Sequence, residues 1–482
     1  MKSLSLFLCP IVVATTLPGR TYGYEVQTHV DLAKAAVNES VLRFAAMLRD
    51  SLGLDKSSDD SSQTFPNSKG VKRTIEQLIQ DGASFEDNVS IFSLSPEVRV
   101  TKHFYDPFTG TGLRHPLLGE VSSPDWAIED RQSDSRQKFS YRDARQAHLD
   151  GLIKSTEVDR QTALGLAFQS LGHVIHHVQD MAQPQHVRND LHCDRPVCAP
   201  FGAYAPSGYE EYSNLPSSRN KITSLSIPEG YDLLNQRFLS AFNVPRKFWH
   251  TEAPGPNSPV LGKGLAEFTQ RNFVSAGTNF ASSAAGFGPN RDFPLPVPTS
   301  TPSNVEVVDV ASLPGVSGLR GQLWFVKSQV VDNYTGAPPV DNLRAATYSI
   351  FDNDLQRVNP GFGRLFSLNR FNYDEAHKFL IPRAVAYSAG LINYFFRGKL
   401  DYVDDPQLPG VNRIRNLSNE TMKGTFAFYY DAPDGTRSPV PNARWEGITL
   451  PPYNASITNP ADPAYGFAVA FNPPTDPALG VL

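Results

Sequence analysis

The sequence predicts a mainly α-helical protein with an irregular insertion and a small β-sandwich-like module at its C-terminus. Apolar residues recur every three or four positions along Glu157 to Val187, as in an amphipathic helix. The apolar run Leu380 to Arg397 is followed by Gly398, a typical residue after a helix end. After Pro409 the sequence alternates between apolar and polar residues around a turn at Asp434-Gly435, which predicts strands.

The remaining elements follow from the same patterns. Helical periodicity predicts further helices over Val26 to Asp50, Lys72 to Asp81, Phe139 to Lys154 and part of Leu261 to Ser275. Between Gly286 and Val340 the residues are mostly Pro, Gly, Ser and β-branched, which predicts an irregular or β-rich insertion over the helical body. We therefore predict a signal peptide over residues 1–23, a helical domain over 24–400 with the insertion at about 286–340, and a β-rich module over 410–482.

The first residues resemble a secretory signal peptide. Lys2 is followed by the apolar run Leu4 to Ala14, which is too short to span a bilayer. Thr21-Tyr22-Gly23 places small residues at a cleavage site, so the mature chain would begin at Tyr24. A cut after Ala14 is the alternative. We expect a secreted or periplasmic protein.

Composition and cysteine usage narrow the function. The 482 residues include 40% hydrophobic and 19% charged residues, as in an ordinary folded protein. The formal net charge of -5 supplies no basic field for a polyanion, so no stable nucleic-acid partner is expected, although a nuclease is not excluded. Cys193 and Cys198 form a C-x4-C pair. In an exported protein this spacing favours a loop-closing disulfide over a thiolate metal site.

The segment HHVQDMAQPQH, from His176 to His186, has the spacing of a metal site. On a helix His176 and Asp180 project from the same face one turn apart, and His186 follows after Gln183-Pro184 ends the helix. Imidazole and carboxylate ligands suit Zn²⁺, although Mn²⁺ or Fe would accept similar ligands. The sequence therefore predicts a zinc site here.

Two motifs resemble a known enzyme family. HHVQDMAQPQH resembles the H-x3-D-x2-QP-x-H signature of the zinc-dependent phospholipase C and P1 nuclease superfamily, and KHFYDPFTG, from Lys102 to Gly110, resembles the HFYDP-x-TG segment of its bacterial phospholipase C branch. The resemblance implies a helical fold with up to three zinc ions. It implies these metal ligands: the backbone amine and carbonyl of Tyr24, then His29, Asp87, His103, His176, Asp180, His186, His192 and Glu210.

Some of these positions remain open from sequence alone. The upstream aspartate is assigned to Asp87, with Glu86 second and Asp81 third. Pro206 stands where the family places a histidine before its glutamate, so either His192 replaces it or the third ion is held more loosely. Glu211 is the alternative to Glu210. For His173 and His177 we expect structural roles, or for His173 a role in orienting a ligand.

The resemblance implies hydrolysis of phosphate esters, most directly phospholipids at a peripheral membrane surface, by a zinc-activated water. Asp180 would bridge two ions, and Asp87 would act both as a ligand and as the catalytic base. A single-strand nuclease of the same superfamily is one alternative. There Phe104, Tyr105 and Phe108 would stack on bases rather than enclose a quaternary ammonium group. A non-catalytic secreted binding protein with a degraded metal cluster is the other.

Overall fold

A computed structural model describes most of the chain. The described residues are 26–87, 99–114, 119–131, 133–190, 192, 207–228, 230–231, 241–275, 297–298, 305–313, 318, 320–348, 358 and 366–471. The predicted signal peptide, Tyr24, Pro206, Cys193 and Cys198 lie outside these ranges. None of the described helices is long and apolar enough to cross a membrane.

Four helices form the centre of the molecule. They are α1 (Val26–Asn38), α3 (Ile75–Glu86), α6 (Glu157–Asp180) and α13 (Tyr373–Phe395), which contact one another and share one hydrophobic core. The helices around them are α2 (Ala45–Leu52), α4 (Ser123–Ile128), α5 (Tyr141–Ile153), α7 (Gly208–Asn214), α8 (Pro216–Thr223), α10 (Asn257–Leu261) and α11 (Leu265–Asn272). Single 3₁₀ turns are η1 (Val41–Arg43), η2 (Arg99–Lys102), η3 (His186–Arg188), η5 (Pro245–Phe248), η7 (Val310–Ser312) and η8 (Pro463–Tyr465).

Local capping explains where the central helices begin. Thr74 and Gln77 form a capping box at the start of α3. The side chain of Thr156 accepts the backbone N–H of Asp159 at the start of α6. The helix predicted over Lys72 to Asp81 therefore begins and ends later, and its last turn reaches the residue before Asp87. Helix α6 ends at Asp180, and His186, the next predicted metal ligand along the chain, follows in η3.

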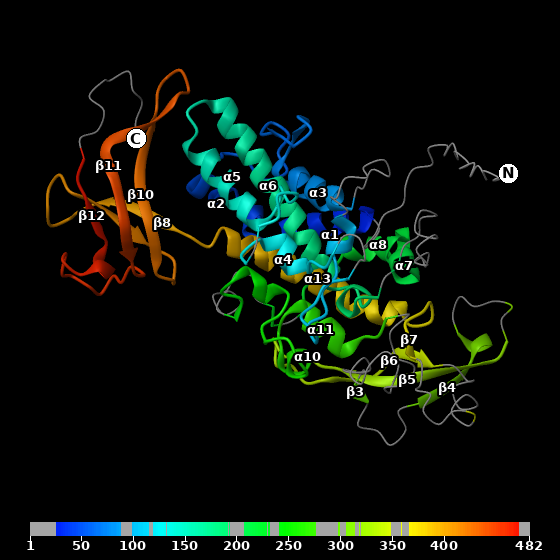
Figure 1. The fold of residues 1–482 in the computed structure, drawn as a ribbon. Coiled ribbons are helices and arrows are strands. Elements are labelled where there is room, and N and C mark those ends of the chain that lie inside the picture. The colour runs from blue at the N-terminus through cyan, green and yellow to red at the C-terminus, as the bar shows by residue number, and fades with distance from the viewer. Residues whose placement is uncertain are drawn as a thin grey trace, which may run out of the picture.

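The insertion forms an antiparallel sheet at one end of the helical body (Figure 1). Its strands are β3 (Val297–Pro298), β4 (Val305–Asp309), β5 (Gln322–Val330), β6 (Val340–Tyr348) and β7 (Phe366–Ser367). The order is β3-β5-β6-β7, and β4 also pairs with β5. Val326, Val330 and Leu343 from this sheet belong to the same core as the helices. The sheet is thus built into the main core.

The C-terminal strands lie at the opposite end of the helical body (Figure 1). The strands β8 (Leu400–Asp404), β9 (Asn412–Asn416) and β12 (Phe467–Val469) form one sheet, and β10 (Met422–Asp431) with β11 (Arg437–Leu450) forms another. Ile414, Leu450 and Val469 make a small separate core between them. Gly435 has a φ of 83° in the turn that joins β10 to β11. A two-stranded ribbon, β1 (Phe65–Pro66) with β2 (Lys72–Arg73), precedes α3.

The prediction of a mainly α-helical protein is wrong. Of the residues that the structure describes, 42% are helical and 19% lie in strands, which form several small sheets, so the protein is a mixture of α and β elements. The sequence underestimated the strands because their pairing is not local. For example, Val307 in β4 pairs with Trp324 in β5, which in turn pairs with Tyr348 in β6. Such pairings depend on tertiary contacts that a local pattern does not report.

Candidate metal centre

Buried histidines and carboxylates from several helices meet where α1, α3, α6 and α7 converge. The predicted ligands that lie in the described part of the chain are all buried: His29, Asp87, His103, His176, Asp180, His186, His192 and Glu210. They fall into three groups with ligand atoms within 4.8 Å of one another, namely His29–His176–Asp180, Asp87–His103–His176 and His186–His192–Glu210. These buried groups could hold metal ions.

Asp180 lies at the middle of these groups. It is the last residue of α6, one turn after His176, and its Oδ2 lies 3.2 Å from His176 Nε2. The same oxygen lies 3.1 Å from His103 Nδ1. Its other oxygen, Oδ1, lies 3.5 Å from His29 Nε2. The carboxylate is therefore placed to face two metal positions, one on each oxygen.

Asp87 completes the second group from the end of α3. Its Oδ1 lies 3.5 Å from both His103 Nδ1 and His176 Nε2. Neither oxygen of Asp87 or Asp180 has a hydrogen-bond partner among the described residues. A buried carboxylate without donors is costly unless a cation balances its charge. This donor set therefore fits a divalent metal.

The third group forms on the far side of Asp180. Glu210 Oε1 lies 3.6 Å from His186 Nε2 and 2.6 Å from His192 Nε2. His192 and Glu210 thus form a direct pair. Burial opposes a charge on His192, but Glu210 raises its pKa to about 9. His186 Nε2 has no hydrogen-bond partner among the described residues. The three atoms lie close enough together to bind one ion, which would replace the proton between His192 and Glu210. The structure brings His192 into this group, while Pro206 lies outside the described residues.

Four of the five ligand histidines have the same orientation. Their Nδ1 atoms each face an oxygen acceptor: Gln179 Oε1 at 2.7 Å from His29, the carbonyl of Ala83 at 2.8 Å from His176, that of His103 at 3.2 Å from His186, and that of Asp190 at 3.0 Å from His192. Because a carbonyl oxygen can only accept, each Nδ1 carries the proton and donates it. The Nε2 atoms therefore face the cluster, where that of His176 also lies 3.3 Å from His103 Nδ1, and their lone pairs are directed as in known metal sites.

The electrostatics of the cluster depend on burial and on neighbouring charges. Burial and the carboxylates of Asp180 and Glu210 raise the pKa of Asp87 well above its usual range. Burial opposes the charge of His103, but Asp180 raises its pKa to about 10. Burial would raise the pKa of Asp180 too, yet His176 and His186 hold it well below its usual range. Metal binding would therefore displace protons from Asp87 and His103.

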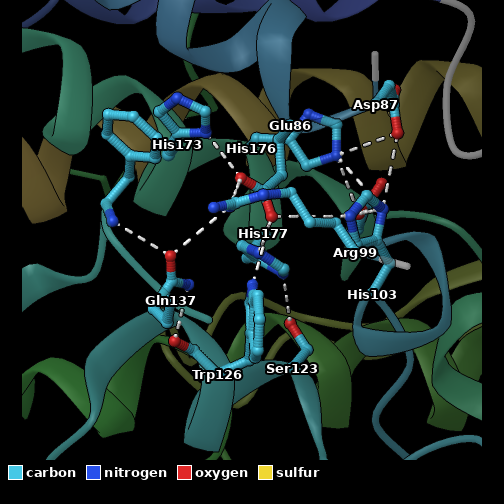
Figure 2. Close-up of polar contacts among 12 residues, drawn as sticks. Glu86, Asp87, Arg99, His103, Ser123, Trp126, Gln137, His173, His176 and His177 are labelled. Carbon is cyan, nitrogen blue, oxygen red and sulfur yellow. Dashed lines mark hydrogen bonds and ion pairs between the residues drawn. The ribbon is translucent and has the colours of Figure 1, made fainter. Parts of the chain in front are cut away.

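A second buried network lies directly behind His103 (Figure 2). At its centre is Glu86, whose carboxylate contacts Arg99, Trp126, His173 and His177. Burial would raise the pKa of Glu86, but Arg99 and the neighbouring histidines hold it well below its usual range. In the prediction from sequence, Glu86 is only the second choice after Asp87 for the upstream metal ligand. Its four partners come from distant parts of the chain, so no local pattern indicated this network.

The structure separates the remaining candidates from the cluster. Asp81 pairs with Arg73 at 3.1 Å and Glu211 is exposed, so neither joins the ligand groups. Phe104 and Tyr105 are buried, and the ring of Phe104 stacks on His186 with centroids 4.5 Å apart. For these two residues the expectation that they stack on bases or enclose a headgroup is wrong, because both rings are already covered by protein, whereas Phe108 is half-buried.

In comparisons with known proteins, no protein family, no curated protein and no solved structure matches the chain. The proposed function therefore rests on the site and on the sequence motifs that form it.

Proposed function

We propose that this protein is a zinc-dependent phosphodiesterase of the phospholipase C type. The observation that carries the proposal is the set of three buried ligand groups, two of which share His176. The resemblance of HHVQDMAQPQH and KHFYDPFTG to the phospholipase C and P1 nuclease superfamily implies most of the same residues as metal ligands, with His192 as the substitute for the histidine that Pro206 replaces. The sequence motif and the spatial arrangement therefore support one reaction class.

Zinc is the metal that the donor set favours. The three groups contain only imidazole nitrogens and carboxylate oxygens, and each combines at least one of each. This mixture suits Zn²⁺ better than the all-oxygen sites of Mg²⁺ or Ca²⁺. Closely spaced zinc ions supply a water of lowered pKa and positive charge beside the phosphoryl oxygens.

The side chains of the proposed site have separate roles in binding the metal and accepting a proton. Asp180 and His176 hold the centre of the cluster, and the Nδ1 hydrogen bonds fix the ring directions. Asp87 has lone pairs on Oδ1 and Oδ2 that no described donor occupies, so it can accept the proton of the attacking water. His186, His192 and Glu210 hold the far end of the cluster. We assign that end to the substrate phosphate.

A phospholipid substrate is favoured over a single-stranded nucleic acid. Nucleases of this chemistry need exposed aromatic rings on which unstacked bases rest. Phe104 and Tyr105, the aromatic residues beside His103, are both 2% exposed, so they can neither carry bases nor enclose a headgroup and do not separate the two substrates. The net charge of -5, however, offers no basic surface for a polyanion. We therefore propose a lipid phosphodiester at a membrane surface as the substrate.

Metal counting and a substrate panel test this proposal. We expect two or three zinc ions per mature chain by mass spectrometry, and hydrolysis of phosphatidylcholine in preference to single-stranded DNA or a chromogenic phosphodiester. The variant His176→Ala should lose bound zinc and nearly all hydrolysis, because His176 belongs to two ligand groups.

The matched control is His148→Ala, which alters a half-buried histidine on α5 outside the ligand groups. It should keep both zinc and activity. Fewer than two zinc ions per wild-type chain would contradict the proposal that the protein is a zinc-dependent enzyme. Faster cleavage of DNA than of lipid would instead favour the nuclease.

A further inference from the structure

His103 differs from the other ligand histidines in its orientation. Those rings face the cluster with Nε2 and donate from Nδ1 to an oxygen. The ring of His103 faces the cluster with Nδ1, 3.1 Å from Asp180 Oδ2 and 3.5 Å from Asp87 Oδ1. To bind a metal through Nδ1, this ring must carry its proton on Nε2. A negatively charged group behind the ring would favour that tautomer.

The group behind His103 Nε2 is the carboxylate of Glu86. Glu86 Oε1 lies 3.9 Å from His103 Nε2, in ion-pair range though longer than a hydrogen bond. Both side chains are completely buried, so the interaction is weakly screened. A negative charge at this position stabilises the proton on Nε2 and leaves the Nδ1 lone pair directed at the cluster.

Glu86 is itself held from four directions (Figure 2). Its Oε2 accepts from Arg99 Nη1 at 2.7 Å and from His173. Its Oε1 accepts from Trp126 Nε1 and His177 Nε2, each at 3.2 Å. Glu86 is also the last residue of α3, directly before Asp87. Fixing Glu86 therefore fixes the end of the helix that presents a second ligand.

The same contacts exclude a fourth metal between Glu86, His103 and His177. These residues have ligand atoms close enough for an ion. However, the Arg99 guanidinium already lies against Glu86, and both carboxylate oxygens accept hydrogen bonds. A metal cation here would be placed beside a buried cation and would have to displace these donors. The group is a support for the metal centre.

We propose that Glu86 is a positioning residue of the metal centre, which holds His103 as its Nε2-protonated tautomer and anchors Asp87 at the end of α3. This inference rests on the proposed metal centre. It extends that proposal beyond the metal ligands, to a buried carboxylate whose role is to orient them.

The test compares Glu86→Gln with wild type, because glutamine keeps the size and removes the charge. We expect about tenfold weaker zinc affinity in a chelator competition, the usual scale for losing such a partner of a ligand histidine. The visible spectrum of the cobalt-substituted protein should change as His103 reorients. The ¹⁵N shifts of the His103 ring should show protonation at Nε2 in wild type and a loss of that preference in the variant.

Two further variants separate positioning from folding. Glu76→Gln makes the same change at the start of α3, where Glu76 lies 3.6 Å from Lys34 and outside every ligand group, and should leave zinc affinity unchanged. Trp126→Phe removes one donor to Glu86 and keeps the ring, so it tests the same network if Glu86→Gln does not fold. Trp126→Phe should weaken zinc binding less than Glu86→Gln does. The loss of zinc affinity in the double variant should be smaller than the sum of the losses in the two single variants.

The outcomes distinguish the two proposals. If wild type binds zinc while Glu86→Gln and Trp126→Phe bind it equally well with the His103 shifts unchanged, the inference is overturned and the metal centre stands. If wild type itself binds no zinc, the metal centre and the inference fall together. Loss of stability without loss of affinity would also overturn the inference, since it would show a purely structural role.

Discussion

At the scale of single residues, the burial of charge decides what the metal centre requires. Asp87, Asp180 and Glu210 are carboxylates with almost no exposure to solvent, brought together by separate segments. Their partners are histidines, and in all of these except His103 the other nitrogen is hydrogen-bonded to an oxygen. A protein interior tolerates such a set only when cations or protons balance it. A bound metal would thus contribute to the stability of this region as well as to its chemistry.

The position of Asp180 predicts a difference between two substitutions. Asp180→Asn should lower the zinc content more than Glu210→Gln does, because Asp180 faces the ligand atoms of two groups whereas Glu210 belongs to one. Metal analysis after gel filtration measures this directly. Equal losses in the two variants would show that Asp180 contributes no more to metal binding than Glu210 does.

His377 predicts how stability depends on pH away from the metal. It lies in α13, and burial, with a contribution from Lys221, lowers its pKa to about 4. The folded state therefore resists protonation, so the stability from this residue is complete above pH 6.5 and is lost as the pH falls towards 4. The full loss is about 3 kcal/mol.

Denaturant unfolding of wild type and His377→Gln at pH 7 and pH 4.5 measures this contribution, with zinc present throughout. The stability of wild type should fall more over this interval than that of the variant, because glutamine does not titrate. Parallel losses in the two proteins would contradict the assignment to His377.

At the scale of elements, the approach of α3 to α6 sets the positions of the ligands. Gly82 in α3 and Gly172 in α6 lie where the helices touch. A Cβ at Gly82 would come within 2.0 Å of the Gln169 carbonyl oxygen, and one at Gly172 within 2.2 Å of that of Ile79. Only glycine permits this distance between the two backbones. Asp87 and His176 therefore face each other because two glycines let their helices approach.

Gly172→Ala should consequently damage both stability and metal binding. We expect a loss of about 1–3 kcal/mol in the free energy of unfolding, the usual range for overpacking, together with weaker zinc binding as α3 moves away. Gly424→Ala is the control, because a Cβ at Gly424 in β10 meets nothing within 4 Å. Denaturant unfolding and zinc titration of both variants provide the comparison. Unchanged zinc affinity in Gly172→Ala would show that the helix spacing does not control the site.

At the scale of the whole molecule, the two β regions differ in their relation to the helical body. The sheet β3–β7 shares the main core through residues such as Leu343, whereas Leu450 lies in the small core between the C-terminal sheets. No described residue beyond Phe396 belongs to the main core. Hydrogen bonds such as those from Arg437 to Leu152 and Ser155 join the C-terminal strands to the body.

This difference predicts that two similar substitutions destabilise different regions of the molecule. Leu343→Ala should cost the helical body about 2–5 kcal/mol, because it opens a cavity in the main core. Leu450→Ala should destabilise the C-terminal strands and leave the body unchanged. The temperature of zinc release measures the stability of the helical body, and calorimetry measures the unfolding of both regions. Earlier zinc release in Leu450→Ala would show that the C-terminal strands support the metal centre.

The sequence by itself determined the local part of the metal centre. The one-turn spacing of His176 and Asp180 places both on one face of α6, because helix geometry is local. Tertiary structure decided which upstream acid joins them. Glu86 and Asp87 are adjacent, but neighbouring side chains at a helix end point in different directions, so Asp87 faces the ligands and Glu86 faces Arg99.

Only the tertiary structure decided the contacts between distant segments. His192 and Glu210 meet across a long connection, and the Glu86 network joins four separate parts of the chain. The strands of the insertion enter the main core for the same reason, which the prediction of a mainly helical fold missed. Periodicity records the burial of one face of an element, whereas the partner of that face is chosen by packing over the whole chain.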